Sequence, residues 1–207
     1  YLQYAKEFGV NNLDVMAGYE WQHFYNEGQS NYNNLKGDNP SNDKWKMENY
    51  LVSFFGRLNY QLFSRYLLTV NVRYDGTSKF PGALKWRWFP SFSGAWRVTE
   101  EPWMESAKDV LSSLKVRGSW GSIGDQSVAG SLYIPTMGQG TTSWVHDGAT
   151  NDVYFATPAA VASTITWQDI TTLGFGLDAK LFNKIGVTFD WYQRKTENMI
   201  VPMEGVG

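Results

Sequence analysis

The sequence predicts an all-β protein, an antiparallel sheet that forms a segment of a transmembrane β-barrel. Three observations support this fold class. Apolar and polar residues alternate with a period of two over long stretches, most charged residues keep to one register of each stretch, and short connections alternate with long ones. We therefore expect about eight strands of a larger barrel, with short periplasmic turns and long extracellular loops.

The clearest alternation begins at Val52, where even positions are apolar, aromatic or glycine and most odd positions are polar. It pauses after Leu62 and resumes at Tyr66, which is typical of a tight hairpin. The expected strands are 50–62, 66–75, 13–24, 87–98, 114–121, 167–181 and 185 to about 200, with a shorter first strand at 1–8.

The connections differ in length and composition. Those at 9–12, 63–65 and 182–184 are short, whereas 26–49, 76–86 and 122–166 are long and rich in Gly, Asn, Asp, Ser and Thr. The connection 99–113 is predicted as a single helix on the short-turn side. Pro102 can start a helix, and Trp103, Ala107, Val110 and Leu114 would share one helical face.

Strand length distinguishes a membrane barrel from a soluble sandwich, whose outer face would also separate polar from apolar residues. Sandwich strands usually have about five or six residues, whereas a tilted membrane strand needs roughly 9 to 11. Stretches 50–62, 66–75 and 167–181 reach the longer value. The apolar registers also carry rings near their ends, as expected of interfacial girdles: Trp21, Tyr50, Tyr60, Tyr66, Tyr74, Trp88, Trp96 and Trp120.

Composition excludes several other classes of protein. The formal charge is −2, whereas a nucleic-acid binder should carry a clear basic excess. With no cysteine and two histidines, neither a disulfide scaffold nor a Cys or His metal site is expected, and we expect no cofactor. The chain starts at Tyr1 without Met or a signal peptide and stops soon after a strand-like run. We expect residues 1–207 to be one part of a longer protein.

Ordered motifs across about 50–200 carry a family resemblance. They include Arg73-Tyr74-Asp75-Gly76-Thr77-Ser78-Lys79-Phe80, Phe89-Pro90-Ser91, Glu100-Glu101-Pro102-Trp103-Met104, Leu114-Lys115-Val116-Arg117-Gly118-Ser119-Trp120-Gly121, Gly124-Asp125-Gln126 and Asp190-Trp191-Tyr192-Gln193-Arg194. In this order they resemble the barrel of SusC/RagA-like TonB-dependent outer-membrane transporters. The chain departs from the family at Gln168, Asp125 and Trp120, where an acid, Asn and Tyr are usual, and none of these changes alters the strand pattern.

The resemblance implies a single barrel domain over 1–207, with the plug and the remaining strands elsewhere in the protein. It implies TonB-energised import of a large nutrient across the outer membrane, most often an oligosaccharide and sometimes a peptide. The implied partners are a SusD-like surface lipoprotein that closes the extracellular mouth, TonB on the periplasmic side, and outer-membrane lipids. No nucleic acid is implied.

Two sets of residues are candidates for function. Rings in the 122–166 loop could contact a ligand or the lipoprotein lid, although loop rings also anchor a loop to a barrel rim: Tyr133, Trp144, Tyr154 and Phe155. Charges in the polar registers should face the lumen, where they could guide a polar substrate but more commonly pair with one another: Arg57, Arg73, Arg97, Arg117, Asp178 and Asp190.

Catalysis is not expected, because Ser143 and His146 do not have the spacing of a nucleophile elbow. Two alternatives to the transporter remain open. One is a soluble surface β-sandwich that binds carbohydrate through its Trp-rich loops. The other is a small, self-contained outer-membrane barrel.

Overall fold

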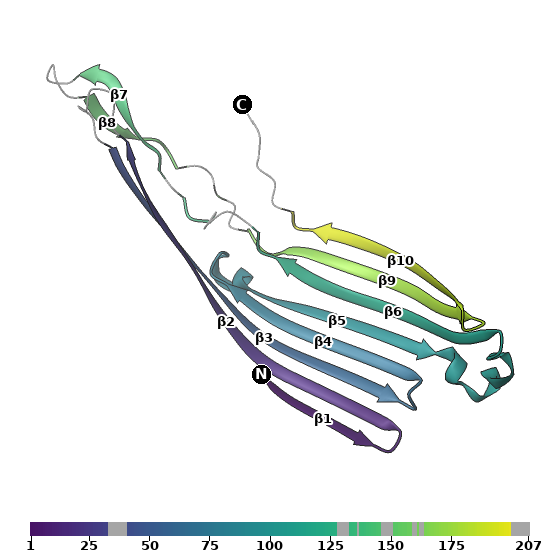
Figure 1. Cartoon of the computed structure of the whole chain (residues 1–207). Coiled ribbons are helices and arrows are strands. Elements are labelled where there is room, and N and C mark those ends of the chain that lie inside the picture. Colours follow the sequence, from purple (N-terminus) through teal and green to yellow (C-terminus); the bar gives the residue numbers. More distant parts are fainter. Residues whose placement is uncertain are drawn as a thin grey trace.

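The structure, a computed structural model, describes residues 1–32, 41–127, 133–135, 137–145, 151–158, 161 and 164–199. Its main feature is one antiparallel sheet of eight strands in the order β1-β2-β3-β4-β5-β6-β9-β10 (Figure 1). The bounds are β1 Leu2–Phe8, β2 Asn11–Tyr32, β3 Ser41–Leu62, β4 Tyr66–Thr77, β5 Trp86–Arg97, β6 Leu111–Asp125, β9 Gln168–Leu181 and β10 Ile185–Glu197. A separate hairpin pairs β7 (Gln139–Val145) with β8 (Asn151–Phe155). The predicted fold class is confirmed.

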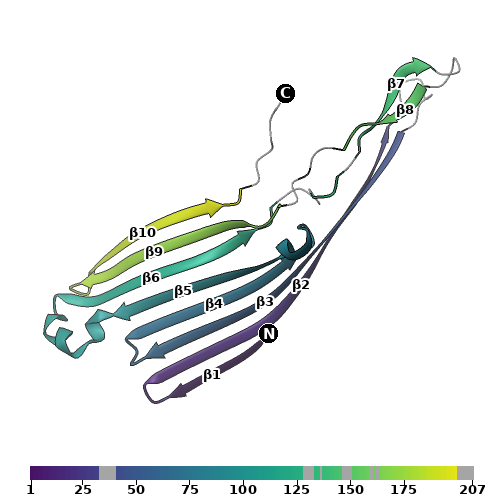
Figure 2. The same cartoon turned by 180° about the vertical axis from the view of Figure 1, so that it is seen from behind.

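The sheet is open, and every strand pairs with its neighbour in sequence except where the β7–β8 hairpin intervenes between β6 and β9. The β1–β2, β3–β4, β5–β6 and β9–β10 connections lie at one end of the sheet, and the β2–β3, β4–β5 and β6–β9 connections lie at the other (Figure 2). The predicted short turns 9–12, 63–65 and 182–184 thus share one end, but the β5–β6 connection at that end, 98–110, is longer than the β4–β5 connection, 78–85. Among the described residues, no helix is both long and apolar enough to cross a membrane.

Two of the short turns share an unusual backbone conformation. Phe63 and Ser64 have φ values of 51° and 57°, and Phe182 and Asn183 have φ values of 52° and 55°. Two successive positive φ values are typical of type I′ turns, whose twist matches that of the flanking strands. The hairpins are closed by backbone hydrogen bonds across the turns. The Leu62 carbonyl accepts from the N–H of Arg65, and the Leu181 carbonyl accepts from the N–H of Lys184.

Cross-strand pairing gives the sheet one polar and one apolar face. The ladder puts Asp14 opposite Asn59, Arg57 opposite Asn71, and Lys115 opposite Asp178, so the expected charges share a face. The opposite face carries exposed apolar side chains from all eight strands. Its rings stack between strands, as in Tyr74–Trp88, Tyr66–Trp96 and Phe92–Trp120. A broad exposed apolar face on strands of 12 to 22 residues suits a lipid environment.

The largest correction concerns the predicted loop 26–49, most of which is strand. β2 and β3 are each 22 residues long and stay paired up to Tyr32 and Ser41. The alternation of apolar and polar residues weakens there because both faces carry polar residues. The period-two pattern therefore did not predict strands in this segment. Trp45 lies against Gly28, where a side chain would clash with the indole ring. β3 pairs with β4 only as far as Leu51, so residues 41–50 project with β2 as a two-stranded hairpin.

The single helix predicted over 99–113 is also wrong. The chain forms two short 3₁₀ segments, η2 (Val98–Glu100) and η3 (Pro102–Ala107), and β6 begins at Leu111. Pro102 does open η3, but Val110 and Leu114 lie outside it, so no common helical face forms. In the predicted loop 122–166, the described residues include the end of β6 and the β7–β8 hairpin. The connection 76–86 contains a further 3₁₀ segment, η1 (Gly82–Lys85).

A small buried core lies beside the β4–β5 connection, where the β5–β6 ladder ends. Phe80 and Trp167 are 0% and 2% exposed, and they pack with Leu51 and Phe89. The Trp167 indole donates a hydrogen bond to the Lys85 carbonyl at 2.9 Å. The core therefore fixes the start of β9 to the β4–β5 connection.

At the short-turn end, a buried carboxylate ties the β5–β6 connection to the rings of the apolar face. Glu101 accepts hydrogen bonds from the Tyr66 hydroxyl at 2.5 Å, the Trp96 indole at 3.0 Å and Arg65 at 3.3 Å. Trp96 also packs edge-on against Trp103 of η3. The hydrogen bond from Tyr66, followed by that from Trp96, lowers the pKa of Glu101 below 4.5.

We expect this carboxylate to make stability depend on pH. Because the pKa of Glu101 is lower in the folded state, its contribution is complete above about 4.5 and is lost as the pH falls through the folded-state pKa. Glu101→Gln should therefore unfold more easily than wild type at neutral pH, and the difference should shrink in acid. The measurement is denaturant unfolding in detergent micelles across pH. Glu100→Gln, at the exposed neighbour, is the control and should show no such trend.

Candidate functional site: the polar face and its rim

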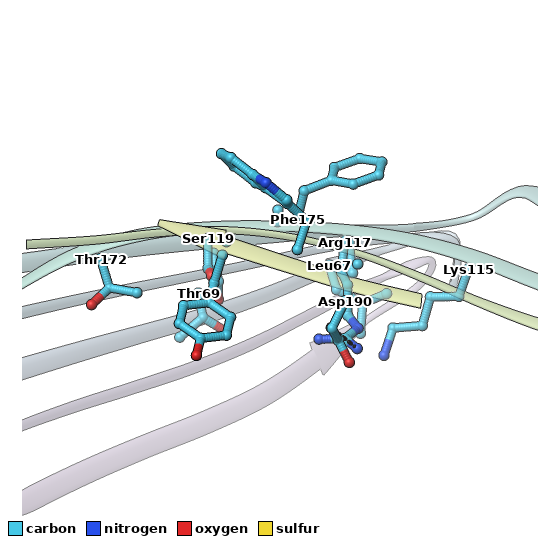
Figure 3. A pocket seen from close by; sticks show the side chains of 16 residues that line it. Leu67, Thr69, Lys115, Arg117, Ser119, Thr172, Phe175 and Asp190 are labelled. Atoms are coloured by element: carbon cyan, nitrogen blue, oxygen red, sulfur yellow. Dashed lines mark ion pairs between the residues drawn. The ribbon is translucent and has the colours of Figure 1, made fainter. Parts of the chain in front are cut away.

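The predicted lumen charges on β6, β9 and β10 form one connected group. Arg117 donates to Asp178 at 3.2 Å and pairs with Asp190 at 2.5 Å. To reach Asp190 it crosses β9 at Gly176, where a Cβ would lie 2.5 Å from the guanidinium carbon. The glycine is therefore what allows a side chain on β6 to reach β10. Figure 3 shows Arg117 and Asp190 on one side of the sheet and Phe175 on the other.

A second group has the same construction. Arg73 on β4 forms an ion pair with Asp75, in which the arginine Nε lies 2.7 Å from one carboxylate oxygen. The same guanidinium group also pairs with Glu20 on β2 at 3.3 Å. It crosses β3 at Ser53, which is fully buried and hydrogen-bonds to the guanidinium at 2.9 Å. The predicted Arg73 and Arg117 thus each cross-link three strands through a small central residue.

The other two predicted arginines lie on the same face but have neutral partners among the described residues. Arg57 donates to Asn71 at 3.1 Å, and Arg97 donates to the Ser64 carbonyl at 3.3 Å. A hollow of about 500 Å³ lies at the Arg117 group, and its lining combines Lys115, Arg117 and Asp190 with small residues such as Ser93 and Gly174. The wall therefore combines charged side chains with hydroxyl and backbone groups.

The predicted loop aromatics lie apart from these groups, at the long-connection end. Tyr154 and Phe155 in β8 are half to two-thirds exposed, and Tyr154 packs over Gly140 of β7. Tyr133 is partly exposed, and Trp144 lies in β7, with its side chain outside the described residues. The β7–β8 hairpin lies beyond the sheet, at the same end as the tips of β2 and β3 (Figures 1 and 2).

Comparison with known proteins assigns the chain to a family. Residues 1–207 match the family model described as TonB dependent receptor-like, beta-barrel. The chain belongs to the TonB-dependent receptor β-barrel family. It is 35% identical to TonB-dependent receptor SusC of Bacteroides thetaiotaomicron, over 97% of this chain and 21% of that protein. It is 31% identical to TonB-dependent receptor P3 of Formosa agariphila, over 98% of this chain and 21% of that protein.

Solved structures agree with the fold. The structure of the RagAB peptide transporter superimposes with a TM-score of 0.75 at 21% identity, over 97% of this chain and 24% of that chain. The open-open state of the RagAB peptide importer gives a TM-score of 0.76 at 21% identity, over 96% and 23% of the two chains.

Membership in the TonB-dependent receptor family distinguishes a membrane-barrel segment from the soluble β-sandwich that the sequence pattern left open. The chain spans about one fifth of the length of the curated relatives named above. It is a segment of an outer-membrane β-barrel, and the receptors of this family are not enzymes. A soluble sandwich is therefore excluded. For this receptor segment we expect the polar face to line the lumen and the apolar face to contact lipid.

The rim of the receptor's polar face holds features that the sequence pattern missed. Arg87 on β5 pairs with Asp169 near the start of β9, although Asp169 falls in the apolar register of its strand. The β5–β6 ladder ends at Ser91, and beyond it the rim core that contains Trp167 separates the strands. A strict period-two pattern could not predict the Arg87–Asp169 pair or the rim core.

Proposed function

We propose that the full-length protein is a TonB-dependent importer of SusC/RagA type, which takes a large neutral glycan across the outer membrane. The observation that carries this proposal is the two-faced sheet. Its apolar face suits lipid, and its polar face offers a hydrated wall for a polar solute.

The chemistry of that wall suits a solute rich in hydroxyl groups. Arg73 is neutralised by Asp75 on its own strand and by Glu20 on β2, and Arg117 by Asp178 and Asp190. Arg57 and Arg97 have neutral partners among the described residues, and the rest of the wall presents hydroxyl and amide groups. Such groups exchange hydrogen bonds with sugar hydroxyls without the cost of removing a charge from water. A peptide is the second candidate substrate, because peptide import is named for the RagAB structures of similar fold.

We also propose the partners that accompany such an importer. A SusD-like lipoprotein would close the mouth at the long-connection end, and TonB would act through parts of the protein outside residues 1–207. The exposed rings of the β7–β8 hairpin support a contact with the lid or the ligand, because two adjacent aromatic side chains, Tyr154 and Phe155, are left facing solvent.

The test is uptake by cells that carry the full-length receptor. A fluorescent neutral oligosaccharide should enter the periplasm only when both the receptor and TonB are present. A labelled peptide mixture serves as the competing cargo. Peptide uptake without glycan uptake would overturn the proposed substrate, and uptake that persists without TonB would overturn the mechanism.

Loop aromatics give a more specific prediction. Trp144→Ala and Phe155→Ala should each weaken binding of the lid or the glycan by about tenfold, as expected for the loss of an aromatic anchor. The measurement is affinity of the full-length receptor in detergent for each partner. Phe182→Ala, at an exposed short turn on the opposite end, is the control. Unchanged affinities for both partners would assign these rings to loop packing.

A further inference from the structure

The lumen side of the projecting β2–β3 hairpin carries exposed apolar side chains where the hairpin leaves the sheet. Phe24 and Met47, at the base of the hairpin, are 49% and 45% exposed. The opposite register there carries Lys46 and Glu48, which pair at 3.4 Å. Because the side bearing Phe24 continues the lumen wall, lipid does not cover it. The receptor thus presents apolar side chains across its own entrance.

These side chains border a cavity of about 680 Å³, which has the size and mixed lining of many small-molecule sites. Three separate chain segments line it. The hairpin contributes Phe24, Met47 and Asn49, the end of β4 contributes Thr77, and the segment after β6 contributes Gln126. Asn49 and Thr77 are 8% and 3% exposed, so polar groups converge beside an apolar wall.

One residue that lines this cavity, Gln126, carries a polar atom with no partner in the described part of the chain. The side-chain oxygen of Gln126 is buried, and no hydrogen-bond donor reaches it from the residues that the structure describes. The ammonium group of Lys79 lies nearby but donates to the backbone carbonyl of Gln126 at 3.2 Å. A buried acceptor without a donor is costly, so it marks a position where a ligand or water donor is expected.

The cavity has a rigid base. The backbone N–H of Tyr50 donates to the Ser78 hydroxyl at 2.9 Å, and the Ser78 N–H donates to the Tyr50 carbonyl at 3.0 Å. Directly below, Leu51 belongs to the buried rim core with Phe80 and Trp167. A site held in this way loses little conformational freedom when a ligand binds.

We infer that this cavity is a sugar-binding subsite at the extracellular entrance of the receptor. A pyranose ring has a face of C–H groups and a rim of hydroxyls. The C–H face matches Phe24, and the hydroxyls match the side chains of Asn49, Thr77 and Gln126, of which the Gln126 oxygen has no donor among the described residues. The charged neighbours have partners of their own, which favours a neutral sugar. The inference rests on the proposed glycan import and adds the place where the glycan is first held.

The experiment measures binding of neutral oligosaccharides to the full-length receptor in detergent by calorimetry. The probes are maltoheptaose, cellohexaose, xylohexaose and mannohexaose, with a casein tryptic digest as the peptide probe. Gln126→Leu removes the acceptor and Phe24→Ala removes the platform. The matched controls are the same changes at the opposite end of the sheet, Gln61→Leu near the end of β3 and Phe63→Ala in the β3–β4 turn.

We expect both entrance variants to bind the recognised oligosaccharide about tenfold more weakly and both controls to bind it like wild type. If the wild-type receptor binds an oligosaccharide and both entrance variants bind it with the same affinity, the subsite is overturned. The proposed glycan import would still stand. Failure of the wild-type receptor to bind any of the four oligosaccharides would overturn both proposals. Weakened binding of the peptide digest alone would replace the sugar with a peptide.

Discussion

Val70→Arg is expected to destabilise the folded receptor by about 2 to 4 kcal/mol, the cost of an arginine on the lipid face of a barrel near the bilayer midplane. Val70 lies midway along β4 between the rings of Tyr66 and Tyr74 and faces the apolar side. Its cross-strand neighbours are Leu58 and Phe92, so no acid is at hand to neutralise the charge.

The neighbouring position provides the control. Thr69→Arg places the same side chain one residue away on the polar face, opposite Asn59. It should cost much less, because that face is hydrated. Unfolding in lipid vesicles gives both free energies. Equal costs at the two positions would contradict the assignment of the faces.

Trp167→Ala is expected to destabilise the receptor by about 3 to 5 kcal/mol, as large-to-small changes of a buried ring do. Trp167 is 2% exposed, packs against Phe80 and Phe89, and donates to the Lys85 carbonyl. Its removal would leave a cavity and an unpaired carbonyl at the rim.

The half-exposed Trp45 is the comparison, since Trp45→Ala removes the same side chain from a solvated position on the hairpin. We expect it to change the unfolding free energy by less than about 1 kcal/mol. The measurement is denaturant unfolding in detergent micelles. A cost of less than about 1 kcal/mol for Trp167→Ala would contradict a stabilising rim core.

The period-two pattern was sufficient to predict the sheet because one face of each strand is apolar and the other polar. It correctly placed Arg57, Arg73, Arg97 and Arg117 on a common face. The pattern failed in the β2–β3 hairpin, where both faces carry polar residues once the strands leave the sheet. The helical spacing of Trp103, Ala107, Val110 and Leu114 failed separately, because only Pro102–Ala107 forms a 3₁₀ segment and β6 begins at Leu111.

The candidate sites depended on contacts that no strand pattern encodes. Arg117 reaches Asp190 only because Gly176 leaves room above the intervening strand. The entrance cavity joins Phe24 to Gln126, which are far apart in sequence and meet only through the folded rim. Gln126 did stand in the sequence within a family motif, but nothing in that motif indicated an unpaired oxygen.

The account's central claim is that this sheet crosses the outer membrane with its polar face toward water. Residues 1–207 contain no cysteine, so single cysteines can be placed along β4, from Tyr66 to Thr77, without background from this segment. In intact outer membranes, a cysteine at odd positions such as 69 and 71 should react with a water-soluble maleimide. Even positions such as 68 and 70 should be protected, and a bromolipid should quench a fluorophore attached there. Equal labelling of both registers, or the reverse pattern, would contradict the claim.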